Sequence, residues 1–215
     1  MKDEAEITPT MLLQAYAAGI FPMADSADAE EFFWVDPKRR GIIPLDRFHL
    51  SRSLRKRVLK GGYEVRVDSA FSEVVTACAN RPDTWINPGI ERLYRALNRM
   101  GYAHSVEIWI DGDLAGGLYG VAIAAAFFGE SMFSRRRDAS KIAAVALVAR
   151  LRAGGFRLLD TQFVTDHLVS LGAVEISRRA YHARLSAALA RPADFFALPL
   201  DASPQELVQL VSQTS

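Results

Sequence analysis

The fold of this chain is decided by the stretch from Phe127 to Lys141, which reads FFGESMFSRRRDASK. The residues just before it, from Leu118 to Phe128, are almost wholly apolar and small, as is typical of a strand buried on both faces. Glu130 follows at the end of this run. A lone carboxylate there requires a partner or a function, because burying an unpaired charge is costly.

The second half of the stretch predicts a charged turn followed by a helix. Three arginines, Arg135 to Arg137, precede Asp138, which can cap a helix, and apolar residues recur at helical spacing from Ala139 to Leu151. Arginines ahead of a helix N-terminus, with its free backbone N–H groups, form a place where phosphate can bind. A solvated basic turn would have the same sequence, so the run alone leaves both interpretations open.

Working outward, the composition is that of an ordinary globular protein. The chain has 215 residues, 50% of them hydrophobic and 24% charged, which allows one domain or two small ones. The net charge is +1, so binding of an anionic partner must depend on local clusters. The acidic N-terminus is unlike a secretory signal and no apolar run is long enough to span a membrane, so we expect a cytoplasmic protein without membrane contact.

Several familiar kinds of site are absent from the sequence. The single cysteine, Cys78, excludes an intrachain disulfide and a thiolate-rich zinc site, and the four histidines have no metal-binding spacing. No Gly-x-Ser-x-Gly elbow, Walker loop or dinucleotide fingerprint is present. We therefore expect no catalytic metal and no cofactor.

The N-terminal part, residues 1–62, predicts a small α/β domain that ends with a basic helix. From Phe48 to Lys60, apolar residues repeat at helical spacing and no acidic residue occurs. The other face carries the cations Arg52, Arg55, Lys56 and Arg57. It is either a solvated face or a contact for a polyanion, and the low net charge of the chain favours the polyanion.

Residues 63–190 predict the main domain, of mixed α/β (α+β) class. A strand at 63–67 is followed by a helix to Ala79 capped by Asp68 or Ser69, a second helix, and a hairpin whose returning strand runs from Leu114 to Phe128. A helix, a strand, a helix and a short strand complete the order. This order is similar to that of the GNAT acyltransferases. Residues 191–215 are expected to form a peripheral tail.

Asp160 and Gln162 lie two residues apart on a predicted strand, so their side chains share a face. If this strand neighbours the one that ends near Glu130, the three polar groups converge. A carboxylate and an amide together can hold a nucleophilic amine and accept its proton. The alternative for Asp160 is a structural carboxylate in an ion pair.

Several segments together resemble the leucyl/phenylalanyl-tRNA–protein transferases. The segments occur in the same order as in that family, and the resemblance covers Leu12 to about Tyr181. They are residues 15–23, 51–56, 84–86, 103–107, 116–122, 129–135, 139–141, 160–162 and 170–173. The resemblance implies an N-terminal domain joined to a GNAT-like domain, which moves Leu or Phe from tRNA to the N-terminal amine of proteins beginning with Arg or Lys. The product is a degradation signal.

The resemblance also implies roles for individual residues. Asp160 and Gln162 correspond to the catalytic pair, which orients or deprotonates the amine or mainly positions the substrate. Glu130 corresponds to the carboxylate at the aminoacyl end and Trp85 to the aromatic residue at the terminal adenosine, although a plain core tryptophan would also fit. The side-chain pocket corresponds to Leu118, Met132, Leu147 and Leu159, and the tRNA contact to Arg52, Arg55, Lys56, Arg57 and Arg135.

Three positions depart from the family pattern. Thr161 replaces a frequent cysteine and is expected to point away from its neighbours, Asp138 replaces a frequent asparagine, and Leu147 stands where some relatives carry an aromatic residue. Two other functions compete: a GNAT-type transferase that uses acetyl-CoA on a small amine, and a non-catalytic RNA-binding module. The arginine run, in place of a glycine-rich pyrophosphate loop, speaks against acetyl-CoA. We expect a monomer.

Overall fold

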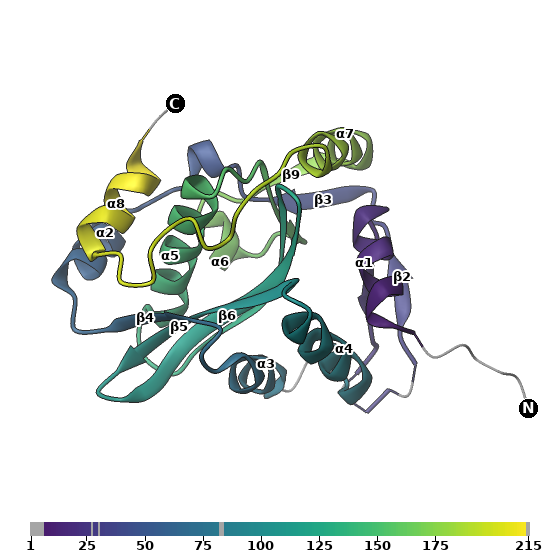
Figure 1. The fold of residues 1–215 in the computed structure, drawn as a ribbon, viewed down its shortest axis with the longest axis horizontal. Coiled ribbons are helices and arrows are strands. Elements are labelled where there is room, and N and C mark those ends of the chain that lie inside the picture. Colours follow the sequence, from purple (N-terminus) through teal and green to yellow (C-terminus); the bar gives the residue numbers. More distant parts are fainter. Residues whose placement is uncertain (1–6, 27, 30, 82–83, 214–215) are drawn as a thin grey trace, which may run out of the picture.

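A seven-stranded mixed sheet forms the centre of the protein in this computed structural model, which describes residues 7–26, 28–29, 31–81 and 84–213 (Figure 1). The strand order is β4-β5-β6-β7-β8-β3-β9, and a separate pair, β1-β2, lies beside the sheet. The strands are β1 (Phe21–Met23), β2 (Phe33–Val35), β3 (Arg39–Ile42), β4 (Glu64–Val67), β5 (Ala103–Ile110), β6 (Asp113–Ile123), β7 (Ala126–Ser134), β8 (Leu158–Gln162) and β9 (Val174–Ser177). The mixed α/β class is confirmed, and the architecture is consistent with a GNAT-like domain.

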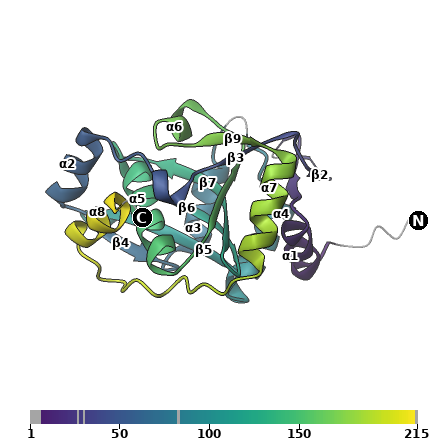
Figure 2. The same cartoon turned by 90° about the horizontal axis from the view of Figure 1, so that it is seen from above.

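Helices cover both faces of this sheet (Figures 1 and 2). One face packs against α5 (Ala139–Ala153), α2 (Arg52–Lys60) and α8 (Pro204–Ser212). The other packs against α1 (Pro9–Ala17), α3 (Phe71–Ala79), α4 (Pro88–Arg99) and α7 (Arg178–Leu189). Two short helices, η1 (Leu45–Arg47) and α6 (Asp166–Val169), lie in connections. None of the helices within the described residues is long and apolar enough to cross a membrane.

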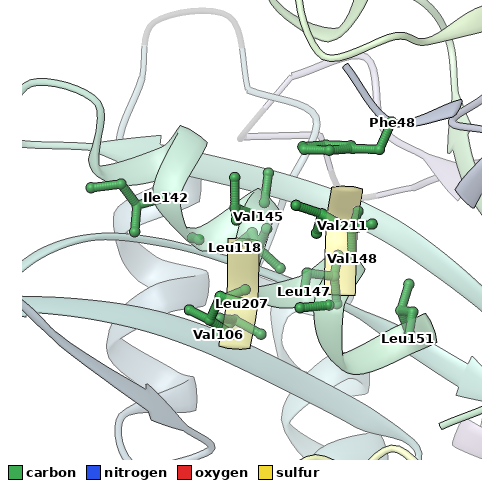
Figure 3. Close-up of a cluster of buried hydrophobic side chains, with 14 of the residues drawn as sticks. Phe48, Val106, Leu118, Ile142, Val145, Leu147, Val148, Leu151, Leu207 and Val211 are labelled. Carbon is green, nitrogen blue, oxygen red and sulfur yellow. The ribbon is translucent and has the colours of Figure 1, made fainter. Parts of the chain in front are cut away.

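The core on the α5 face includes the end of the chain. Nearly every residue of α5 is buried, and Figure 3 shows its side chains meeting Leu207 and Val211 of α8. Arg150 of α5, itself buried, donates hydrogen bonds to the carbonyls of Phe195 and Leu198. The tail that the sequence indicates as peripheral therefore contributes buried side chains to this core.

The single strand predicted from Leu114 to Phe128 is wrong, because β6 and β7 form a hairpin. The chain reverses at Ala124, whose φ of 49° lies in the left-handed region. That conformation usually selects Gly, Asn or Asp, so an alanine in an apolar run carries no sign of a turn. As a consequence, Glu130 lies inside β7 rather than after a strand.

The helix caps differ in detail from those predicted. Asp138 occupies the N-cap position of α5 with φ of 65°, but its side chain makes no capping hydrogen bond. Ala70 precedes α3 where Asp68 or Ser69 was expected as the cap. Asp68 instead accepts one hydrogen bond from the backbone N–H of Ser105 and forms another with His104 Nδ1.

The feature that positions the site is the separation of β7 from β8. These two strands are parallel and pair only as far as Phe128 with Asp160. Just beyond, Glu130 is the extra residue of a bulge in β7, because Tyr119 pairs with Ser131 and Gly120 with Gly129. On the other side of β8 lies β3, which comes from the region expected to form the N-terminal domain. The division of the chain at residue 62 stays a prediction.

Candidate active site

A cavity of about 470 Å³ lies where β7 and β8 diverge. Its walls come from β1, β6, β7, β8, α5 and α6. One part is apolar and another carries Glu130 and Gln162. Strand ends that diverge in an open α/β sheet are a common place for a ligand, which makes this cavity the candidate site.

Glu130 is held on the cavity wall by two buried tyrosines. Its Oε1 accepts a hydrogen bond of 2.7 Å from Tyr16 of α1, and its Oε2 accepts one of 2.6 Å from Tyr94 of α4. Burial raises the pKa of the Glu130 carboxyl to about 7, although the two phenol hydrogen bonds oppose this rise. The carboxyl therefore changes its charge close to neutral pH.

Asp160 lies behind the cavity in a buried ion pair with Arg40. Both side chains are at most 1% exposed, and Arg40 donates from Nε and Nη2 over 3.0 and 2.6 Å. The guanidinium lies 4.4 Å from the ring centres of both Phe21 and Tyr181. This geometry matches the structural alternative that the sequence left open for Asp160.

Gln162 links the two carboxylates. Its backbone N–H donates to Oδ1 of Asp160 over 2.9 Å, and its Nε2 lies 3.4 Å from Oε1 of Glu130. The φ of Gln162 is 55°, which costs backbone energy in a residue that is not glycine. Gln162 thus lies close to both carboxylates, but the prediction that Asp160 and Gln162 face the same side is wrong, because Gln162 lines the cavity and Asp160 does not. The left-handed backbone at Gln162 interrupts the alternation of a regular strand.

The apolar residues predicted for the side-chain pocket also come together. Leu118, Met132, Leu147 and Leu159 all line the cavity. Trp85 lines it too and is half-buried. Thr161, which was expected to point away from its strand neighbours, likewise lies on the cavity wall.

The predicted tRNA-binding cations lie outside the cavity. Arg52, Arg55 and Lys56 are exposed on α2, and none of the ion pairs between described residues involves them. Arg57 instead donates to the carbonyl of Gly61 over 2.9 Å. Arg135 is exposed, with one hydrogen bond to the carbonyl of Leu114.

Four residues of the site were missed by sequence reasoning: Tyr16, Arg40, Tyr94 and Tyr181. The tyrosines occupy apolar positions of helices and look like ordinary core residues. Arg40 lies in a short strand next to Arg39, which is exposed. No local pattern distinguishes a buried arginine from its exposed neighbour.

A sheet split between two parallel strands, with polar groups beside an apolar pocket, is consistent with a GNAT-like acyltransferase domain. The family model described as "Leucyl/phenylalanyl-tRNA protein transferase" matches residues 42–186, and the model of that family's N-terminal domain matches residues 5–38. This chain belongs to the leucyl/phenylalanyl-tRNA–protein transferase family.

Individual relatives named leucyl/phenylalanyl-tRNA–protein transferase are similar to this chain over nearly their whole length. Those from Roseobacter denitrificans and Cereibacter sphaeroides are 58% and 57% identical over 209 residues, which is 97% of this chain and 99% and 98% of theirs. The relative from Jannaschia sp. is 57% identical over 195 residues, 91% of this chain and 92% of its own. The protein is therefore an enzyme, an aminoacyltransferase.

Proposed function

We propose that this enzyme transfers Leu or Phe from aminoacyl-tRNA to the N-terminal amine of proteins that begin with Arg or Lys. The observation that carries this proposal is a single cavity lined by the apolar residues Leu118, Met132, Leu147 and Leu159 and by the polar pair Glu130 and Gln162. The pocket suits an unbranched or γ-branched apolar side chain. The polar groups suit the amine that attacks its carbonyl carbon.

The acyl donor is already activated, because it is an ester of the tRNA ribose. The reaction then needs neither ATP nor a metal ion, but only a site that excludes water, holds the amine against the carbonyl and stabilises the developing charge. A buried carboxylate such as Glu130 also attracts a cationic N-terminus. Acceptors with a basic first residue fit this charge.

The terminal adenosine of the tRNA is assigned to the part of the cavity next to Trp85. A half-buried tryptophan offers a stacking surface worth on the order of 1–3 kcal/mol per base. From there the acceptor stem continues to exposed cations. We assign its phosphates to Arg52, Arg55 and Lys56 of α2, with Arg57 and Arg135 as further contacts. We place the reaction in the cytoplasm, where tRNA is charged, and propose that the enzyme acts as a monomer.

The test is transfer of labelled amino acid from Leu-, Phe- and Met-charged tRNA to peptides that begin with Arg, Lys or a neutral residue. We expect Leu and Phe to be transferred to the basic peptides and not to an N-acetylated Arg peptide. Acetyl-CoA is the control donor. Turnover of acetyl-CoA without tRNA, or binding of tRNA without any transfer, would overturn the proposal in favour of one of its two competitors.

A further inference from the structure

The carboxylate of Asp160 has no acceptor capacity left for an attacking amine. Its Oδ1 accepts from Arg40 Nε and from the backbone of Gln162, and its Oδ2 accepts from Arg40 Nη2 and from the Tyr181 hydroxyl over 2.8 Å. A carboxylate offers about four lone-pair positions, and four donors occupy them. Asp160 is fully buried and is not part of the cavity wall. Protonating it would also leave the Arg40 charge buried without a counter-charge.

Glu130, in contrast, lies on the cavity wall and accepts hydrogen bonds only from neutral groups. The Tyr16 and Tyr94 hydroxyls donate to its two oxygens over 2.7 and 2.6 Å, and Gln162 Nε2 lies 3.4 Å from its Oε1. These three donors leave one of about four lone-pair positions for a further group. None of the ion pairs between described residues involves Glu130, so a proton can add to it without leaving a buried cation unpaired.

We propose that Glu130, supported by Tyr16 and Tyr94, is the group that accepts the proton of the attacking amine, and that Asp160 is a positioning residue that acts through Gln162. This inference rests on the function proposed above. Asp160 holds the backbone N–H of Gln162 in its left-handed conformation, which places the Gln162 side chain against Glu130. Arg40 holds Asp160 in turn.

The step balances without another reactant. The amine nitrogen forms a bond to the carbonyl carbon of the ester, and one proton passes from nitrogen to an oxygen of Glu130. The bond between the carbonyl carbon and the ribose oxygen breaks, and Glu130 returns the proton to that oxygen. The products are the amide and the uncharged tRNA, and the carboxylate is regenerated.

The pH dependence follows from the groups that face Glu130. Tyr16 of α1 and Tyr94 of α4 donate to it, and Gln162 of β8 lies against it. Burial raises the pKa of Glu130, the two phenol hydrogen bonds lower it, and the charges of Asp160 and Arg40 raise and lower it in turn, so that the pKa is about 7. The carboxylate is the active form, so kcat falls as the pH drops below about 7.

The experiment measures kcat against pH at saturating leucyl-tRNA and one Arg-starting peptide. The acidic limb is the part of this curve where kcat falls with falling pH. Tyr94→Phe and Tyr16→Phe each remove a hydrogen bond to the ionised Glu130, so each should move the midpoint of the acidic limb upward by about one pH unit. Glu130→Gln should lower kcat by about 100-fold or more and remove that limb. Asp160→Asn should lower kcat but leave the limb in place. The amine of the peptide also titrates, so each profile is repeated with a second Arg-starting peptide whose N-terminal amine has a different pKa, and the limb that does not move with the amine is the one assigned to Glu130.

The opposite pattern would overturn the inference: a limb that is retained in Glu130→Gln and lost in Asp160→Asn. Limbs that stay at the wild-type pH in both tyrosine variants would also overturn it. Circular dichroism and thermal unfolding of each variant show whether it is folded, and the tyrosine variants are nearly isosteric. Failure of the wild-type enzyme to transfer leucine at any pH would instead refute the proposed function.

Discussion

The properties of the two carboxylates in this site depend on the groups that surround them more than on their chemical type. Glu130 and Asp160 are both carboxylates on neighbouring strands. Asp160 pairs with an arginine, whereas Glu130 accepts hydrogen bonds only from neutral donors. The pairing gives Asp160 a permanent counter-charge. Glu130 has no such partner, so burial disfavours its charged form and its pKa rises to about 7.

At this scale, Glu130→Gln should stabilise the protein above neutral pH. The pKa of Glu130 rises on folding from 4.5 to about 7, so its contribution to stability is full below pH 4.5 and is lost as the pH rises through 7. The variant should therefore gain about 1–3 kcal/mol in the free energy of unfolding at pH 8, and little at pH 4.5. Urea unfolding at the two pH values measures this. An equal effect at both would contradict it.

A second prediction at the residue scale concerns the choice of amino acid. Leu147 lies on the cavity wall, so Leu147→Ala should enlarge the pocket and raise the ratio of Phe to Leu transfer by about 10-fold, within the roughly 1–3 kcal/mol that one methylene can supply. Competition between the two charged tRNAs measures the ratio. The matched control is Leu151→Ala, one turn along α5, which is buried but does not line the cavity. A shift of the ratio in the control as well would attribute the effect to loosened packing.

At the scale of elements, α2 separates packing from charge. Leu54 and Val58 are buried against the rest of the protein, while Arg55 and Lys56 are exposed on the other side of the helix. This division follows directly from the helical repeat of the sequence. The exposed basic residues can therefore be replaced without removing side chains from the core.

Replacing both Arg55 and Lys56 by alanine should weaken binding of tRNA and flatten its salt dependence, with the slope of log K against log salt reduced by about one to two. Fluorescence titrations at several salt concentrations measure both effects. The charge-matched control is Arg179→Ala with Arg184→Ala, two exposed cations of α7. If the control pair changes the slope as much as the α2 pair does, the contact is not on α2.

At the scale of the whole molecule, parts far apart in the sequence complete one another. The C-terminal helix α8 buries Leu207, Val208 and Val211 against α5 and α2, and β3 from the first 62 residues closes the sheet beside β8. The site therefore depends on both ends of the chain, although the chemistry lies near its middle.

We accordingly expect Leu207→Ala to lower the free energy of unfolding by about 2–4 kcal/mol, through the lost burial and the cavity that remains. Urea unfolding measures the loss. Gln209→Ala, an exposed position on the same helix, is the control and should change stability by less than about 0.5 kcal/mol. A loss below 1 kcal/mol for Leu207→Ala would mean that the tail is peripheral after all.

The sequence by itself determined the features that repeat locally or that resemble a family over short segments. The helical pattern of α5, the basic face of α2, the pairing of Asp160 with Gln162 on one strand and the mixed α/β class were all readable, because each depends on neighbours a few residues away. The family resemblance added the pocket residues Leu118, Met132, Leu147 and Leu159, which the structure brings together.

Only the tertiary structure decided which residues contact one another in the site. Arg40 meets Asp160 across 120 residues of sequence and Tyr16 meets Glu130 across 114, and contacts of that range leave no periodic signal. The β6-β7 turn at Ala124 was equally invisible, because packing rather than a turn residue imposes its left-handed backbone. The charge state of a buried group depends on every element packed against it. For this reason the division of labour between two similar carboxylates emerges only once the chain is folded.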